Sequence, residues 1–407
     1  MKLLYVTSSF PYGHGEGFLV AELNELEAQG HEVVVVPALA RGPVVHDDVR
    51  PLIARTQKAP LLSAAIASSA LREARRSPAA SARRFAALRD GRSPLIVAKN
   101  AAVVPKSLWA ARLARELAVD HVHAHWAGTS ATIAMLASEL TGIPWSFTVH
   151  RWDIREDNLL RRKADSAAFV RAISADGLAD LRRKVDGTST PTLLIHMGVP
   201  LQRRPAATSP RPREEPLRVL VPANLLEVKG HRHLLEAVAL LRDREVPVRV
   251  VLAGRGPLRA AIERQIDSLR LDDACSLAGQ LSHPDLLRRL SEGEWEAVVM
   301  PSIETRSGEK EGIPVSLLEA MSYGVPVVGT RVGGMVELLD DGSGLLVPPA
   351  DAHALAAALE TLAGDAELRA RLAERGRAKV ERDFASESVV RELVARFEGA
   401  AATRRSR

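Results

Sequence analysis

The chain has 407 residues and a net charge of +5; 46% of its residues are hydrophobic and 26% are charged. These values are typical of globular proteins and exclude a disordered, fibrous or membrane-embedded chain. The length favours two domains, because a domain has about 150 residues. The single cysteine, Cys275, cannot form an internal disulfide, and the first residues lack the apolar stretch and cleavage site of a secretion signal. We therefore expect a cytoplasmic protein without a membrane-spanning helix.

Short β-rich runs alternate with longer helical patterns in the first half of the chain, an order typical of parallel sheets with crossover helices. Strands are expected at residues 2–7, 32–37, 121–125, 145–150 and 169–174. His121, His123 and His125 alternate, so all three lie on one face of a strand. A packed or cleft-lining role is favoured over a metal site, because no cluster of carboxylates or cysteines completes a ligand set.

The same alternation starts again in the second half, after a proline-rich segment at 203–216 that we interpret as a linker. Strands are expected at 217–222, 248–253, 274–278, 297–301, 325–329 and 344–347, and helices at 231–242, 257–269, 284–290 and 315–322. The segment 352–396 is nearly all helix-forming. The pattern predicts an α/β protein with domains at 1–202 and 217–385 and, at 386–407, a helix and a tail. We expect this helix to cross back to the first domain. Ligands of such folds bind at the carboxyl edges of the sheets.

Positive charge is concentrated between Arg41 and Asp120, where 15 lysines and arginines face 6 acidic residues. A solvated, arginine-rich surface explains this surplus. Contact with anionic lipid headgroups is the alternative, because the apolar stretch Leu61–Leu71 is followed by Arg72, Arg75, Arg76, Arg83 and Arg84. Nucleic acid is not expected as a partner, since aromatic residues, which stack on bases, make up only 4% of the chain.

The segment from Glu311 to Glu319, EGIPVSLLE, carries the clearest chemistry. Pro314 suits the first turn of a helix, and Gly312 lets a ligand approach the backbone. The unpaired N–H groups of residues 312–316 then form an anion site with room for a diphosphate. The carboxylates of Glu311 and Glu319 flank this anion and are suited to accept hydrogen bonds from the hydroxyl groups of a linked sugar and ribose. An amphipathic helix with a solvated glutamate at each end explains the same spacing.

This segment and its surroundings resemble the retaining glycosyltransferases of family 4, whose GT-B fold has two Rossmann-like domains facing across a cleft. The resemblance rests on the two glutamates with seven residues between them, on AMSYGVPVV after them, and on GGMVE and GSGLLVPP further along. It covers nearly the whole chain, with matches such as GHEV at Gly30 and AGRGP at Ala253. The segments HAHW at His123 and SFTVH ending at His150 are most similar to members that build exopolysaccharides by extending lipid-linked glycans.

The resemblance assigns roles to residues of the second half. Lys229 would stabilise the charge that develops on the leaving diphosphate. Asn224 stands where many family members carry an arginine, and it brings no charge. Gly254 lies in a turn that would contact the nucleotide, although a tight strand-to-helix turn needs glycine whether or not anything binds. The base is expected near Gly279 and Leu281. The predicted donor site comprises Asn224, Lys229, Gly254, Gly279, Leu281, Gly312, Ile313, Pro314, Val315 and Glu319.

Two features of the first half complete the predicted site. A loop with Gly13, Gly15 and Gly17 follows the first strand and has more glycines than an ordinary strand-to-helix turn needs, so we expect Gly15 and Gly17 to approach the donor sugar. His150 matches the family histidine that hydrogen-bonds this sugar near the reaction centre. Without the resemblance, a single histidine at a strand end is more often structural. His150 and Glu311 are the predicted catalytic residues.

The resemblance implies transfer of a hexosyl group from a UDP- or GDP-linked sugar to a hydroxyl group of a glycan or lipid-linked acceptor, with retention and without a cofactor. No metal is expected, because the chain contains no Asp-X-Asp triplet; the helix start and Lys229 would neutralise the diphosphate instead. The alternatives are transfer to a small aglycone such as an aminoglycoside, a nucleotide-sugar epimerase, and a non-catalytic GT-B subunit. The basic first half favours transfer over epimerisation, and the presence of both glutamates and Lys229 argues against a decayed site.

Overall fold

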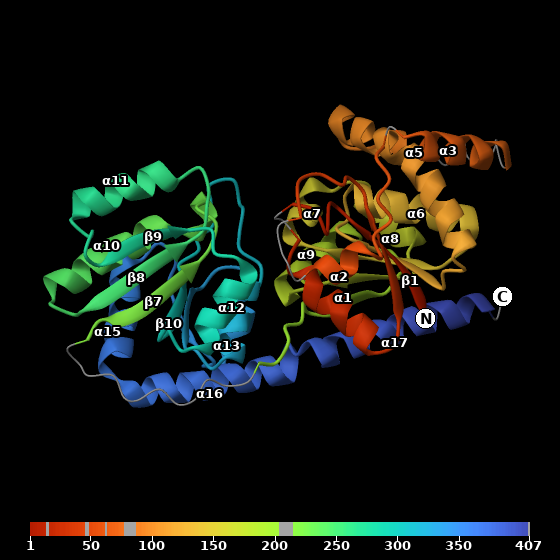
Figure 1. Cartoon of the computed structure of the whole chain (residues 1–407). Helices are drawn as coiled ribbons and strands as arrows, with labels where there is room; N and C mark the ends of the chain where they lie inside the picture. Colours follow the sequence, from red (N-terminus) through yellow and green to blue (C-terminus); the bar gives the residue numbers. More distant parts are fainter. Residues whose placement is uncertain (14–15, 45–48, 62, 77–86, 203–214, 406–407) are drawn as a thin grey trace. The chain divides into compact units, whose positions relative to one another are not determined.

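The computed structural model describes residues 1–13, 16–44, 49–61, 63–76, 87–202 and 215–405 (Figure 1). The chain divides into unit 1, Met1–Gly198 with Glu387–Arg407, and unit 2, Val199–Ser386. In its described part, each unit contains a six-stranded sheet whose paired strands all run parallel. The predicted α/β class with two Rossmann-like sheets is therefore confirmed. The observed division differs from the predicted boundaries at 202 and 385 by a few residues, and most of the predicted linker lies outside the described residues.

The sheet of unit 1 has the strand order β2-β1-β3-β4-β5-β6. Its strands are β1 (Lys2–Thr7), β2 (Glu32–Pro37), β3 (His121–His125), β4 (Trp145–Val149), β5 (Phe169–Ala172) and β6 (Thr192–Leu194). Nearly every residue of the first five strands is buried, as expected for parallel strands that are covered on both faces. All five predicted strands are present, although β4 and β5 end earlier than predicted. The three-residue β6 was not predicted, because so short a strand shows no periodic pattern.

Helices cover both faces of this sheet and create two hydrophobic cores. The helices are α1 (Leu19–Ala28), α2 (Arg50–Ile53), α3 (Ala64–Arg76), η2 (Ala87–Asp90), α5 (Pro94–Glu116), α6 (Thr129–Thr141), α7 (Arg151–Glu156), α8 (Leu160–Ser166), α9 (Ala175–Lys184) and α17 (Ser386–Arg405). Residues of α5, α6 and α8 form one core, and residues of α1 and α17 belong to the other. Figure 1 shows α17 running beside α1 and the start of β1. Phe397 of α17 packs on the ring of His121, with 4.8 Å between the centroids.

The sheet of unit 2 has the strand order β12-β11-β10-β7-β8-β9. Its strands are β7 (Leu217–Pro222), β8 (Val248–Ala253), β9 (Cys275–Gly279), β10 (Ala297–Met300), β11 (Val327–Thr330) and β12 (Leu345–Val347). Each one overlaps a predicted strand, with shifts of one or two residues at some ends. Such shifts arise because hydrophobic runs continue past the last paired residue.

The helices of unit 2 are η3 (Glu227–Lys229), α10 (His231–Asp243), α11 (Arg259–Leu269), α12 (His283–Ser291), α13 (Val315–Ser322), α14 (Gly334–Leu339), α15 (Ala352–Gly364) and α16 (Ala366–Asp383). The four predicted helices between the strands are present. Helix α14 was missed, because its first residue is a glycine that normally indicates a turn. Packing requires that glycine: a Cβ at Gly334 would lie 2.7 Å from backbone atoms of Gly312 and Ile313. None of the described helices is both long and apolar enough to span a membrane.

Candidate functional site

The strand order of unit 2 reverses at β7, which pairs with β8 on one side and with β10 on the other. Ligands of open parallel sheets bind at such a switch point, outside the carboxyl ends of the strands. Lys229 follows β7, Glu311 follows β10, and their side chains form an ion pair between Nζ and Oε2. The Oγ atom of Ser302 lies 3.5 Å from the same Glu311 oxygen. The residues predicted to contact the diphosphate and the sugar are thus directly paired.

A pocket of about 220 Å³ opens beside this pair within unit 2. Its walls come from the carboxyl ends of β7 and β8, the loop after β9 and the start of α13. Among the residues that line it are four of the predicted donor residues, Asn224, Lys229, Gly254 and Leu281. The volume is below the range of about 300–1,000 Å³ that is typical of sites for drug-sized ligands. The pocket by itself therefore has room for only part of a drug-sized ligand.

Three predicted glycines of this region differ in what surrounds them. A Cβ at Gly254 would lie 1.9 Å from the carbonyl oxygen of Ala223, so the close approach of two backbones already requires glycine there. Gly279 has a φ of +71°, and no atom lies within 4 Å of where its Cβ would be. The space around Gly312 is equally open. Gly279 and Gly312 thus leave room for a ligand, whereas backbone packing explains Gly254.

Helix α13 begins at Val315, and Pro314 is its N-cap residue with φ −71° and ψ 119°. The prediction that Pro314 lies in the first turn is wrong by one residue, because its ψ is extended. No side chain from the described part of the chain caps this start. Ser316, in the first turn, lines the pocket. The helix start that was predicted to bind an anion, with Gly312 and Ile313 before it, therefore lies at the edge of the pocket.

Glu319 lies in the second turn of α13 and is 9% exposed. Its Oε1 atom is 2.6 Å from Nε2 of His283, the first residue of α12. His283 follows the loop Gly279–Leu281 that was predicted to contact the base. His283 was not among the predicted site residues, because in sequence a histidine beside a proline at a helix start is indistinguishable from an ordinary surface residue. The contact fixes the orientation of the carboxylate that was predicted to bind the ribose.

The switch point of unit 1 lies at β1, which pairs with β2 and β3. His150 follows β4 and is the N-cap of α7. Its ring stacks on Trp126 with 4.1 Å between centroids, and its Nε2 lies 2.7 Å from Nε2 of His125. Burial, as the larger cause, and the positive charge of Arg171 together lower the pKa of His150 to about 3. His150 is therefore a neutral imidazole at physiological pH.

Of the two predicted loop glycines, Gly17 lies next to Phe18, whose ring centroid is 5.7 Å from that of His150. Gly17 and His150 thus belong to one neighbourhood in unit 1. Gly15 lies outside the described residues. The remaining predicted site residues all belong to unit 2.

The three alternating histidines of β3 are fully buried on one face, as predicted. His123 contacts Ser146 Oγ at 2.8 Å and Thr148 Oγ1 at 3.0 Å, and His121 contacts the same serine at 2.8 Å. Burial lowers the pKa of His121 to about 3. In the described ranges, no group of three or more histidine, cysteine or acidic side chains is arranged to hold a metal ion. These histidines act as packed, hydrogen-bonded core residues.

The buried histidines predict acid lability. The unfolded chain binds protons below about pH 6.5, whereas folded His121 and His150 remain neutral down to about pH 3, so stability is lost as the pH falls through this window. Each such histidine lowers the free energy of unfolding by about 1.4 kcal/mol per pH unit. We expect the melting temperature to fall steadily between pH 6.5 and 4.5. In His121→Gln, the number of protons taken up on unfolding should be smaller by about one, so the melting temperature should fall less steeply. A flat profile would contradict this prediction.

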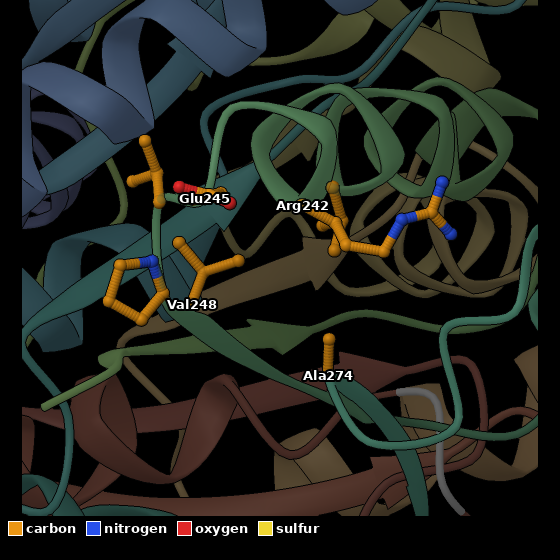
Figure 2. A pocket seen from close by; sticks show the side chains of 7 residues that line it. Arg242, Glu245, Val248 and Ala274 are labelled. Carbon is orange, nitrogen blue, oxygen red and sulfur yellow. The ribbon is translucent and has the colours of Figure 1, made fainter.

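Figure 2 shows a second pocket of unit 2, of about 550 Å³. It is lined by Val238, Arg242, Glu245, Val246, Pro247, Val248 and Ala274. Val248 begins β8 and Ala274 precedes β9, so this pocket lies at the amino ends of the strands. None of the predicted site residues lines it. It is therefore separate from the candidate donor site.

Comparison with known sequences supports the resemblance. The profile of the family Glycosyl transferases group 1 matches residues 203–379. WcaL of Escherichia coli K12, a glycosyltransferase named for colanic acid biosynthesis, is 36% identical over 202 residues, or 48% of each chain. The chain spans about half the length of the first curated relatives that it matches. Alpha-D-kanosaminyltransferase of Streptomyces kanamyceticus is 30% identical over 291 residues, which cover 65% of this chain and 72% of the relative.

The fold also matches solved structures. HepE of Anabaena, crystallised in complex with UDP, aligns with a TM-score of 0.69 and 17% identity over 98% of this chain and 100% of HepE. Two parallel Rossmann-like units of this kind make up the GT-B fold. The match to the kanosaminyltransferase covers 72% of that relative, and further relatives, such as WcaL, are of the exopolysaccharide type. Together with the fold, these matches show that the chain belongs to the group 1 glycosyltransferases, family 4.

Proposed function

We propose that this protein is a retaining glycosyltransferase that moves a sugar from a nucleotide diphosphate sugar to a hydroxyl group of an acceptor. The observation that carries the proposal is the Lys229–Glu311 ion pair at the switch point of unit 2, beside the pocket. An ammonium group stabilises the charge that develops on a leaving diphosphate. A carboxylate next to it is suited to accept hydrogen bonds from sugar hydroxyl groups. HepE, of the same fold, has been crystallised with UDP and with UDP-glucose.

The donor would extend across unit 2 from base to sugar. The base would lie near Gly279 and Leu281, where the space beside Gly279 is open. The ribose would hydrogen-bond Glu319, whose carboxylate is oriented by His283. The diphosphate would lie between Lys229 and the start of α13. Glu311 would contact the transferred sugar, and His150 would contact it from unit 1. Because Nε2 of His150 already bonds His125, contact with the sugar would exchange or share that hydrogen bond.

In the proposed reaction, the bond between the anomeric carbon and the diphosphate oxygen breaks. A new bond to the acceptor oxygen forms on the same face of the sugar, and the acceptor proton passes to the departing phosphate oxygen. The protein supplies positioning and charge stabilisation, and no base of the protein is needed for this proton. No metal ion would be needed either, because Lys229 and the N–H groups of the helix start would neutralise the diphosphate.

The proposed acceptor is a glycan or a lipid-linked glycan, as the names of relatives such as WcaL suggest. A small aglycone of the aminoglycoside type is the second candidate, because the match to the kanosaminyltransferase covers 72% of that relative, whereas the match to WcaL covers 48%. Product analysis separates these candidates from the remaining alternatives. An epimerase would convert the nucleotide sugar without an acceptor, and a binding subunit would leave it unchanged.

A thermal-shift panel of UDP-, GDP- and ADP-linked sugars in excess EDTA tests the donor site. We expect one nucleotide class to stabilise the protein by about 2.7 kcal/mol when it is present at 100 times its dissociation constant. Arg242→Ala, which alters the second pocket, should leave this shift unchanged. If no nucleotide sugar raises the melting temperature, the proposed function fails. A shift that requires Mn²⁺ or Mg²⁺ would overturn only the proposed independence from metal ions.

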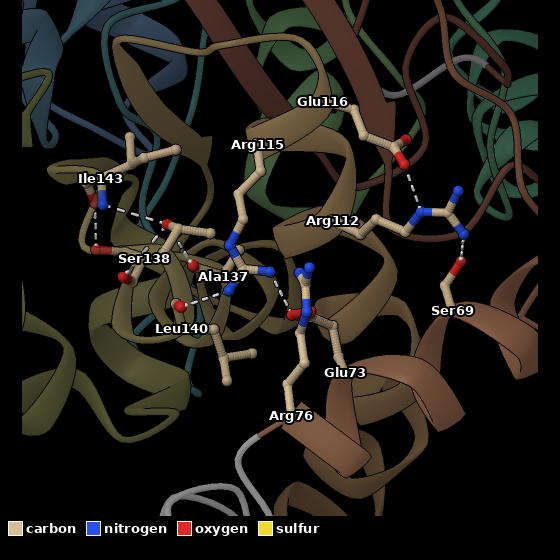
Figure 3. Close-up of polar contacts among 11 residues, drawn as sticks. Ser69, Glu73, Arg76, Arg112, Arg115, Glu116, Ala137, Ser138, Leu140 and Ile143 are labelled. Atoms are coloured by element: carbon tan, nitrogen blue, oxygen red, sulfur yellow. Dashed lines mark hydrogen bonds and ion pairs between the residues drawn. The ribbon is translucent and has the colours of Figure 1, made fainter.

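We further propose that the exposed face of α3 docks on anionic lipid at the cytoplasmic face of a membrane. Only part of the basic surface that was predicted to contact lipid headgroups is available for this docking. Seven of its 15 cations are paired with acidic side chains or buried: Arg55, Arg76, Arg92, Lys99, Lys106, Arg112 and Arg115. Figure 3 shows buried Glu73 of α3 between Arg76 and Arg115. The exposed side chains that remain on α3 include Leu71, Arg72 and Arg75, while Arg83 and Arg84 lie outside the described residues.

Vesicle sedimentation tests this docking. We expect the protein to sediment with anionic vesicles at low salt and less at high salt. Arg72→Gln/Arg75→Gln should weaken binding about 30-fold, because each surface arginine contributes about 1 kcal/mol. The matched control is Arg391→Gln/Arg396→Gln, which removes the same charge from exposed positions of another helix of unit 1, α17. Equal binding of both double variants would show that α3 has no special role.

A further inference from the structure

The carboxylate of Glu16, just before α1, is buried at the carboxyl end of β1. It is 4% exposed, and its two oxygens accept hydrogen bonds from five donors. The donors are Ser8 N (3.0 Å), Ser9 N (2.6 Å), Phe10 N (2.7 Å), Ser9 Oγ (3.1 Å) and Trp126 Nε1 (2.8 Å). A buried carboxylate requires such donors, since loss of hydration must be offset. Glu16 thereby ties the loop after β1 to the residue that follows β3.

The indole that Glu16 holds belongs to a strained residue. Trp126 has a φ of +80°, a conformation that costs a non-glycine residue about 1–3 kcal/mol and persists only where its surroundings hold it. Its backbone N–H donates to Thr148 O at 3.1 Å, and its indole N–H donates to Glu16. The ring, fixed from both sides, stacks on His150 with an interplanar angle of 23°. Strain of this kind concentrates at functional sites.

The segment that begins at Glu16 contacts His150 a second time. The ring of Phe18 lies 5.7 Å from the His150 ring and 6.2 Å from the Trp126 ring. The His150 ring is thus held by Trp126, by Phe18 and by the hydrogen bond to His125. Glu16 fixes the ring of Trp126 through its hydrogen bond to the indole, and it lies two residues before Phe18 in the chain.

We propose that Glu16 is a positioning residue of the sugar transfer, which acts through the indole of Trp126 to fix the orientation of His150. This inference rests on the proposed function, in which His150 contacts the donor sugar. Glutamine cannot replace Glu16 without loss. One oxygen is met by Ser8 N and Trp126 Nε1 and the other by Ser9 and Phe10, so an NH₂ group would face N–H donors in either orientation.

The test compares Glu16→Gln, Trp126→Phe and the double variant. Trp126→Phe keeps a ring against His150 but removes the N–H group that Glu16 holds. We expect each single variant to lower kcat about tenfold or more while the affinity for UDP stays within about twofold, because the nucleotide binds unit 2. The kcat of the double variant should be no lower than that of the less active single variant, because both substitutions break the same linkage between Glu16 and Trp126.

The matched control is Trp145→Phe. Trp145 is 1% exposed and donates its indole N–H to Ser166 O at 3.0 Å, so its variant also loses a buried hydrogen bond in unit 1. We expect this control to lose stability but to keep kcat within about twofold. If Trp126→Phe lowers kcat no more than Trp145→Phe does, or if the effects of Glu16→Gln and Trp126→Phe add, the proposal is overturned.

An NMR measurement on the free protein separates this proposal from the proposed function. The imidazole signals of His150, assigned with His150→Gln, should shift and broaden in Glu16→Gln and stay unchanged in Trp145→Phe. If the wild-type protein binds no nucleotide sugar, the proposed function fails whatever the spectra show. Unchanged His150 signals in Glu16→Gln would overturn the positioning role even in an active enzyme.

Discussion

Replacement of Glu311 by glutamine is expected to lower turnover about 100-fold and, at the same time, to strengthen the binding of a nucleoside diphosphate. Lys229 is paired with Glu311, so a diphosphate must compete with this carboxylate for the ammonium group. The amide of glutamine is neutral and similar in size, and it releases Lys229. We expect a gain in UDP affinity of several-fold, up to about tenfold, which calorimetric titration would measure.

Lys229→Ala provides the opposite comparison. It removes the cation, so both turnover and UDP affinity should fall, the latter about tenfold or more, since a hydrogen bond to a charged group contributes about 1.5–3 kcal/mol. Arg242→Ala is the matched control, because it removes another cation of unit 2 at the second pocket. If Glu311→Gln and Lys229→Ala both have small, equal effects, α13 is an ordinary amphipathic helix and the site lies elsewhere.

Arg171→Met is expected to destabilise unit 1 by about 3–5 kcal/mol, which corresponds to roughly 6–20 °C in melting temperature. Arg171 and Glu22 form a buried ion pair, 0% and 1% exposed, with 2.6 Å between Nη1 and Oε2. Arg171 also donates Nε to Ile195 O at 2.8 Å and Nη2 to His196 O. Methionine would leave Glu22 as a buried charge whose remaining hydrogen-bond partner, among the residues that the structure describes, is the hydroxyl of Tyr5. Calorimetric unfolding measures the loss.

Two further variants check the cause of this loss. Arg391→Met breaks an exposed ion pair on α17 and should change stability by less than about 1 kcal/mol. Adding Glu22→Gln to Arg171→Met removes the uncompensated charge and should restore part of the stability. If Arg171→Met loses no more than Arg391→Met, the buried pair does not stabilise the fold in the expected way.

The elements were predictable because their cause is local. A buried parallel strand requires a run of apolar residues, such as LLYV in β1 or VVVV in β2, and the turns between elements require glycine or proline. The topology then places residues that are far apart in sequence at one edge. Lys229 and Glu311 each follow a strand beside the switch point, so their association followed from the fold class.

Side-chain partners were not predictable, because they depend on how elements pack. Arg171 in a strand and Glu22 in a helix each look like an exposed charge until the fold buries them against each other. The same holds for His283 beside Glu319. For the same reason, the sequence does not show which of the basic residues of the first half are paired or buried. Lys106, for example, is fully buried and donates to the carbonyl oxygens of Ala38 at 3.1 Å and Ala59 at 2.9 Å.

The return of α17 to unit 1 has a consequence for the order in which the protein folds during synthesis. Unit 2 is one continuous stretch, Val199–Ser386, whose core residues all leave the ribosome before α17 does. The core of unit 1 beside β1 and β3 remains incomplete until Val390, Leu393 and Phe397 arrive. Unit 2, although second in the sequence, can therefore finish folding first, while an apolar face of unit 1 waits for its cover and is available to chaperones.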